Sequence, residues 1–146
     1  MGYISPDAKW YLADIVQRIE VEGDPRLVVH TNVVLIRADS PDEAYTKATE
    51  IGAASEISYG NPDGKRVDIM YCGLSDLNVI HDELEHGAEL TYTEKIGIDD
   101  AAIRRLIPSK EELGIFAPRR TSTGPDYKSR DVVDQMHREL PGTLET

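Results

Sequence analysis

The first third of the chain has the hydrophobic pattern of two β-strands. Between residues 10 and 19 apolar side chains occupy alternate positions, and Gln17 interrupts this apolar face. Side chains alternate between the two faces of a strand, so this pattern predicts a strand with one better-buried face. Residues 27–38 are rich in Val, Leu and Ile, which favours a second strand. The short turn Glu22-Gly23-Asp24-Pro25 between them predicts antiparallel pairing.

The pattern then changes to a helical period. Ser40 is a suitable N-cap, Pro41 suits the first helical position, and Glu43 is placed for a capping box. Small and apolar residues recur at helical spacing as far as Ile51. Glycine commonly ends a helix, so the helix is predicted to stop at Gly52.

Further strands are expected after this helix. The turn Asn61-Pro62-Asp63-Gly64 combines a proline-fixed φ with a glycine that can adopt positive φ. It is predicted to join a short strand at residues 56–60 to a longer one at about residues 65–75. Residues 88–96 have the composition of a final strand. The expected fold class is therefore α+β: an antiparallel sheet of four to five strands in β-β-α-β-β order, with one helix packed on a face.

The C-terminal third is predicted to form a separate arm. Residues 1–98 are expected to be a compact domain, and residues 99–146 an arm with short helices that begin after Asp99 and Ser109. Residues 118–125 have the composition of a linker. The linker is followed by a predicted helix with one apolar stripe. Such a helix must bury its stripe on its own domain, on a second copy or on a partner. The stripe, a candidate docking helix, consists of Val132, Val133, Met136 and Leu140.

Charge separates the same two parts of the chain. The 146 residues contain 27 acidic residues and 16 Lys and Arg, a formal charge of −11. Counted along the sequence, residues 1–98 have a net charge of −10 and residues 99–146 a net charge of −1. Nucleic-acid binding depends on neutralising phosphates with basic side chains, so this balance argues against a nucleic-acid partner. No apolar run approaches the ~18 residues of a membrane span, and the first residues resemble no secretion signal. The expected location is the cytoplasm.

Candidate chemistry is concentrated in the sequence His81-Asp82-Glu83-Leu84-Glu85-His86. Zinc sites of the HExxH type place their histidines four residues apart on one helix face. Here the two histidines are five residues apart, which argues against a metal site. The alternatives are a solvated surface, a binding surface for a basic protein, and acid–base catalysis. The candidate partner-binding residues are Asp76, Asp82, Glu83, Glu85 and Glu89.

Other motifs that would indicate a reaction are absent from the sequence. There is no phosphate-binding loop, no nucleophile elbow and no pair of cysteines, so we predict no cofactor, no metal and no catalytic residue. Cys72 is the single cysteine; it lies between apolar strand residues and is predicted to be buried.

Several pieces of the sequence together resemble a family. They are Lys9-Trp10-Tyr11, the strand Val34-Leu35-Ile36-Arg37-Ala38 that runs into Ser40-Pro41-Asp42-Glu43-Ala44-Tyr45-Thr46-Lys47-Ala48, then Gly73-Leu74-Ser75-Asp76-Leu77, and the acidic stretch from Glu83 to Glu89. The set resembles a small bacterial family, domain of unknown function 4288, over about residues 10–95. The resemblance implies a bacterial, cytoplasmic protein and one compact unit. It implies no activity, cofactor or catalytic residue.

Two functions fit these observations. The first is a non-enzymatic binding module, of an immunity, antitoxin-like or regulatory kind, whose acidic surface binds a more basic protein. The alternative is a small ligand-binding or hydrolytic enzyme with a carboxylate site. A homodimer formed through the C-terminal arm is a further possibility that the sequence leaves open.

Overall fold

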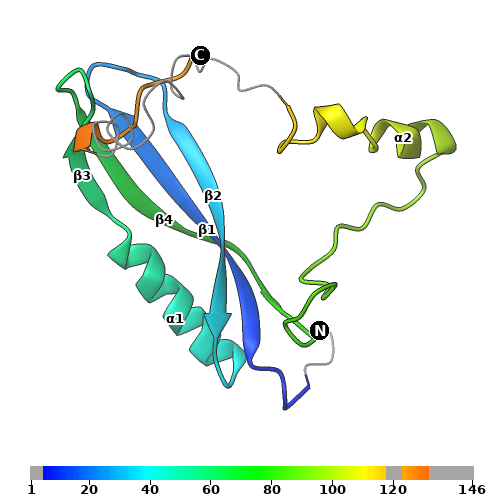
Figure 1. Ribbon diagram of the computed structural model, residues 1–146. Coiled ribbons are helices and arrows are strands. Elements are labelled where there is room, and N and C mark those ends of the chain that lie inside the picture. Colours follow the sequence, from blue (N-terminus) through cyan, green and yellow to red (C-terminus); the bar gives the residue numbers. More distant parts are fainter. Residues whose placement is uncertain (1–4, 118–122, 132–146) are drawn as a thin grey trace.

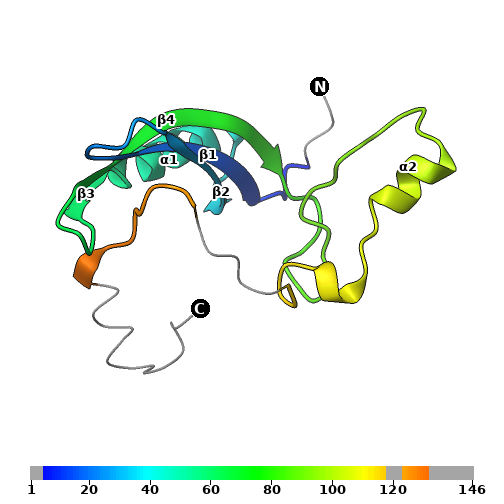
Figure 2. The same ribbon diagram turned by 90° about the horizontal axis from the view of Figure 1, so that it is seen from above.

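The protein is built on one curled antiparallel sheet with a helix on one face (Figures 1 and 2). The computed structural model describes residues 5–117 and 123–131. The elements are β1 (Trp10–Val21), β2 (Val28–Arg37), α1 (Pro41–Ala54), β3 (Ile57–Gly60) and β4 (Arg66–Val79), and the strands lie side by side in the order β2-β1-β4-β3. The α+β prediction, with four strands and one main helix, is confirmed.

The core lies between α1 and the apolar face of β1 that the sequence predicts. Tyr11, Ala13 and Ile15 are buried there against Ala44 and Ala48 of the helix. Gln17 interrupts this face because it meets the end of the helix. Its amide donates a hydrogen bond to Ser55 Oγ at 2.8 Å and accepts one from Asn32 at 2.7 Å.

Beyond Gln17 the same face of the sheet is covered by a different part of the chain. Ile19 and Val21 form a second buried cluster with Val67 of β4. Residues 123–131, here called the strap, lie near this end of the sheet (Figure 2). Pro125 in the strap is buried, which is not what a solvated linker predicts for this residue.

Side chains from β3 and from the turns at this end of the sheet hold the strap by its backbone carbonyl groups. Arg26 donates to Thr123 O at 2.7 Å, and Asn61 donates to Asp126 O at 3.0 Å. The hydroxyl of Tyr59 donates to the carbonyl oxygen of Tyr127. The ring of Tyr127 in turn meets His30 edge-on, with 5.3 Å between the ring centroids.

The start of α1 has the predicted N-cap, but Glu43 does not complete the capping box, because its carboxylate accepts the N–H of Asp39 at 3.4 Å and not that of Ser40. The end of the helix also differs from the prediction. Ser40 Oγ accepts the backbone N–H of Glu43 at 3.1 Å, and Pro41 occupies the first turn. The helix continues past Gly52 to Ala54, so the predicted stop is wrong. A Cβ at Gly52 would lie 2.4 Å from Cε1 of Tyr71. The glycine therefore allows the helix to approach β4 closely instead of ending the helix.

The turn between β3 and β4 is confirmed. Gly64 has φ of 77°, a conformation that favours glycine. Asn61, which is buried, organises the turn because its Oδ1 accepts the N–H groups of Asp63 and Lys65 at 3.0 and 2.8 Å.

Two further expectations are wrong. Residues 88–96 form no strand, because the chain leaves the sheet after β4 and strand propensity alone supplies no pairing partner. Cys72 is exposed rather than buried. It lies at an irregularity in the pairing of β4 with β1, where Gly73 pairs with Val16 and Tyr71 with Gln17, and Cys72 is skipped.

Residues 90–117, here called the arm segment, run away from the sheet (Figure 1). They include the short helix α2 (Asp100–Arg105) and the 3-10 turn η1 (Lys110–Glu112). Asp99 caps α2 by accepting the N–H of Ala102 at 2.8 Å. The candidate docking helix, with Val132, Val133, Met136 and Leu140, lies outside the described residues.

Candidate functional site: an acidic loop and a projecting arm

The acidic loop, residues 81–89, follows β4 directly. It contains four of the five candidate residues, and all four are exposed. Asp82 and Glu89 come together, because Asp82 Oδ2 accepts the backbone N–H of Glu89 at 3.0 Å. The carboxylates of Glu83 and Glu85 have no hydrogen-bond or ion-pair partner within the described residues. The loop therefore presents carboxylates to solvent that form no ion pair within the described residues.

The fifth candidate, Asp76, lies elsewhere. It is in β4, on the face of the sheet opposite α1, here called the open face, and directly opposite Asp14 of β1. Its carboxylate accepts from the backbone of Leu77 and the amide of Asn78, both at 2.9 Å. At a rise of about 3.3 Å per residue, Asp76 is about 10 Å from the end of β4 at Val79. The structure thus does not bring Asp76 into the acidic loop.

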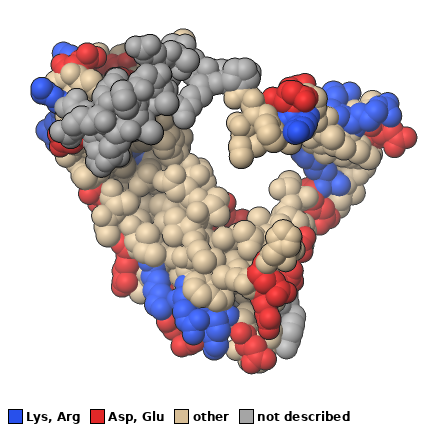
Figure 3. Space-filling view, viewed as in Figure 1, with Lys and Arg blue, Asp and Glu red and all other residues tan. Residues whose placement is uncertain are grey.

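Two depressions adjoin the loop, and Asp82 and Glu83 line one of them together with Lys9 and Arg37. Asp82, Glu83 and Glu85 line the other, a shallow depression, together with His86. No group of three or more metal-ligating side chains occurs in the described part of the chain. Acidic side chains gather on the surface around the end of β4 and this loop (Figure 3).

The arm segment that follows the loop exposes large apolar side chains. Their exposed fractions range from 38% for Ile98 to 88% for Ile115, and neither buried core cluster includes any of them. Figure 3 shows an open space between the arm segment and the sheet. The exposed apolar residues are Leu90, Tyr92, Ile96, Ile98, Ile103, Leu106, Ile107, Leu113, Ile115 and Phe116.

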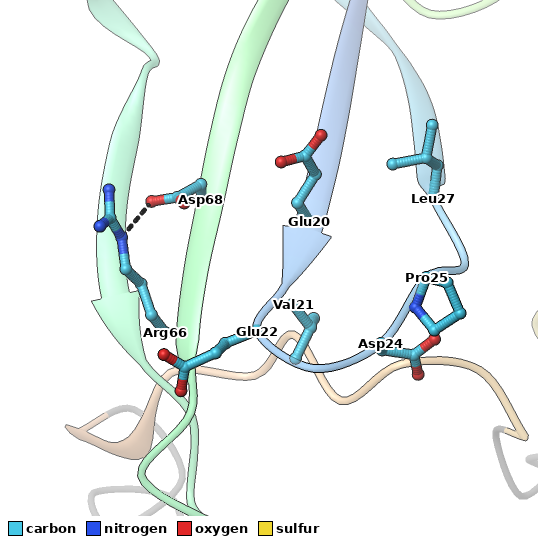
Figure 4. Close-up of a pocket in the computed structure, with 8 residues that line it drawn as sticks. All are labelled: Glu20, Val21, Glu22, Asp24, Pro25, Leu27, Arg66 and Asp68. Atoms are coloured by element: carbon cyan, nitrogen blue, oxygen red, sulfur yellow. Dashed lines mark hydrogen bonds and ion pairs between the residues drawn. The ribbon is translucent and has the colours of Figure 1, made fainter.

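A second charged surface, at the opposite end of the sheet, was not predicted from the sequence. It is a depression lined by both signs of charge (Figure 4). Arg26 donates to Asp24 at 2.7 Å and lowers the pKa of this carboxyl to about 2. Hydrogen bonds from Ser58 and Arg66 lower the pKa of Asp68. The lining residues are Glu20, Val21, Glu22, Asp24, Pro25, Leu27, Arg66 and Asp68.

The sequence did contain a signal for this second surface. Acidic and basic residues two positions apart share one face of a strand, and such pairs occur as Arg18–Glu20 and Arg66–Asp68. These pairs satisfy most of the charge in the depression internally. Glu83 and Glu85 of the acidic loop have no ion-pair partner in the described part of the chain. The loop is therefore the better candidate for binding a partner.

Comparison with known families identifies the compact part of the molecule. The family model described as Domain of unknown function (DUF4288) matches residues 10–92. The chain belongs to this family. The DUF4288 match includes the four strands, α1 and the acidic loop, and it ends at Tyr92 in the arm segment. Comparison with curated proteins found no match, and comparison with solved structures found none either.

One further property concerns membranes. Among the helices of residues 5–117 and 123–131, none combines the length and the apolar composition that crossing a membrane requires.

Proposed function

We propose that this protein is a non-enzymatic binding module whose partner is another protein with a basic surface. The acidic loop and the arm segment together form the contact surface. The loop supplies charge and the arm segment supplies apolar side chains, the combination that protein–protein interfaces use in their rims and cores.

The exposed apolar side chains of the arm segment carry this proposal. Where many large apolar side chains are exposed in one part of a protein, they often mark a contact site. Ile96, Ile107 and Ile115 are each more than two-thirds exposed. A partner that covers them would bury surface that the sheet and α1 leave in water.

The charge of the neighbouring loop supports a basic partner. Glu83 and Glu85 lack partners within the described residues, and the whole chain has a charge of −11. Electrostatic attraction would steer a basic protein toward this end of the molecule and would make association faster at low salt.

The enzyme alternative has less support. A catalytic carboxylate pair needs one group in an apolar pocket that raises its pKa. The five candidate carboxylates are all exposed, and Asp76 lies apart from the rest. An immunity or antitoxin-like role in the bacterial cytoplasm is one specific form of the binding proposal, since such a role requires masking a basic protein.

The proposal is tested by neutralising the loop. A variant with Asp82→Asn, Glu83→Gln and Glu85→Gln is compared with the wild-type chain in affinity capture from the source organism, at low and high salt. We expect the wild-type chain to retain a basic protein that high salt releases, and the loop variant to retain much less of it.

A matched variant controls for net charge. Glu22→Gln, Glu50→Gln and Asp63→Asn remove the same number of negative charges from exposed positions outside both the loop and the arm segment. This variant should capture the partner as the wild-type chain does. Equal losses in both variants, or a captured protein that salt does not release, would count against the acidic loop as the binding site.

A further inference from the structure

Strand β2 forms a free edge of the sheet. Its register with β1 is continuous from Arg37 to Val28, and β1 is its single neighbour in the sheet. The N–H of Ala38 donates to the carbonyl of Lys9 at 2.9 Å. Hydrogen-bonded pairs alternate along an antiparallel ladder, so even-numbered residues of β2 bond to β1 and odd-numbered residues direct their backbone groups outward.

These outward backbone groups have no partner within the described residues. They belong to Val29, Thr31, Val33 and Leu35, for which no hydrogen bond to another segment occurs. The side chains of Val29, Val33 and Leu35 are 60%, 61% and 45% exposed. These three side chains lie on the open face, because the β1 residues paired with them point away from α1.

The β2 edge also lacks the features that normally protect an edge strand. Proteins block exposed edges with Lys, Pro, inward-pointing charges, β-bulges or short strands. Residues 27–36 contain no Lys, Arg, Asp, Glu or Pro, and the register of β2 with β1 shows no bulge. The other edge strand, β3, is only 4 residues long.

We propose that β2 pairs antiparallel with β2 of a second copy of this chain, with the two-fold axis at Asn32. This arrangement sets Val29 opposite Leu35 of the second copy and Thr31 opposite Val33 of the second copy. All the outward N–H and C=O groups of the strand then pair, and the sheet continues across both molecules.

The β2 edge is free of the charges that would keep two copies apart. Two chains of charge −11 repel each other wherever their acidic surfaces meet. The uncharged run from Leu27 to Ile36 lets the two strands approach without placing like charges opposite each other. The proposed dimer involves a different surface from the acidic loop and the arm segment, so it goes beyond the proposed function and can fail independently of it.

Sedimentation equilibrium of the full chain tests the proposal. We expect a mass of twice 16.3 kDa, with dissociation to monomer on dilution. Val33→Lys places a charge at the paired edge, and it should raise the dimer dissociation constant roughly tenfold or more. Ile51→Lys adds the same charge at an exposed position of α1 and should leave the constant unchanged. Far-UV circular dichroism checks that both variants fold.

Disulfide trapping tests the two-fold axis. In a Cys72→Ser background, Asn32→Cys should form an intermolecular disulfide on mild oxidation, because the two copies of residue 32 face each other across the axis. Leu35→Cys should not, because it faces residue 29 of the second copy. A wild-type chain that stays monomeric up to about 100 µM, equal effects of the two Lys variants, or cross-linking at residue 35 but not at residue 32 would overturn the proposal.

Discussion

At the scale of single residues, the exceptions to the hydrophobic pattern proved informative. Gln17 was predicted to interrupt an apolar face, but the pattern could not show that it bonds to Ser55 at the end of α1. Such a bond joins residues that are 38 positions apart in sequence, and no local spacing encodes it. Asp24 was predicted as a turn residue, whereas its ion pair with Arg26 appears only when the turn is built.

The Asp24–Arg26 pair predicts a pH dependence. The pKa of Asp24 is lowered to about 2, first by the side-chain hydrogen bond from Arg26. A carboxyl with a lowered pKa in the folded state contributes stability above its unfolded pKa, and this contribution is lost as pH falls through its folded pKa. The contribution of Asp24 should therefore disappear between about pH 4 and pH 2.

Carboxyl NMR titration checks this prediction directly. Asp24 should titrate near 2 in the wild-type chain, and its pKa should move upward toward 3.8 in Arg26→Gln. A wild-type Asp24 that already titrates close to 3.8 would show that the ion pair does not form in solution.

At the scale of elements, the sequence was sufficient where local chemistry decides the structure. Ser40, Pro41 and Glu43 predicted the start of α1, and the residues from Asn61 to Gly64 predicted the β3–β4 turn. The sequence was insufficient for the strap. The sheet holds the strap mainly by its backbone carbonyl groups, which every residue possesses, so no side-chain pattern marks this segment.

Gly52 provides a test of how α1 packs on the sheet. Gly52→Leu should improve the intrinsic helix propensity by nearly 1 kcal/mol, yet it places a side chain where the ring of Tyr71 already lies. We expect a net loss of about 1–3 kcal/mol in the free energy of unfolding, because overpacking outweighs the gain in propensity.

Urea denaturation of matched variants measures this loss. Ala53→Leu adds the same side chain at the next position of α1, which is exposed, and should change stability by no more than about 0.5 kcal/mol. If Gly52→Leu were as stable as Ala53→Leu, the close approach of the helix to Tyr71 would not matter energetically.

At the scale of the whole molecule, the distribution of charge and apolar surface matters most. The acidic excess in residues 1–98 was evident from the sequence. The arrangement of the acidic residues in space was not evident from the sequence, because Asp76 lies on the sheet while the four other candidate residues lie in a loop. The exposure of the apolar side chains of the arm segment was also missed, since residues 88–96 had the composition of a strand and short helices were predicted after Asp99 and Ser109. Apolar composition indicates burial, but it does not say in which molecule the burial occurs.

The most direct test of the proposed binding function is hydrogen exchange measured by mass spectrometry. The full chain is measured alone and with the basic protein that the wild-type chain captures and the loop variant loses. We predict slower amide exchange in residues 81–117, which include the acidic loop and the arm segment, and little change in α1. Unchanged exchange in residues 81–117, with protection confined to other parts of the chain, would contradict the account.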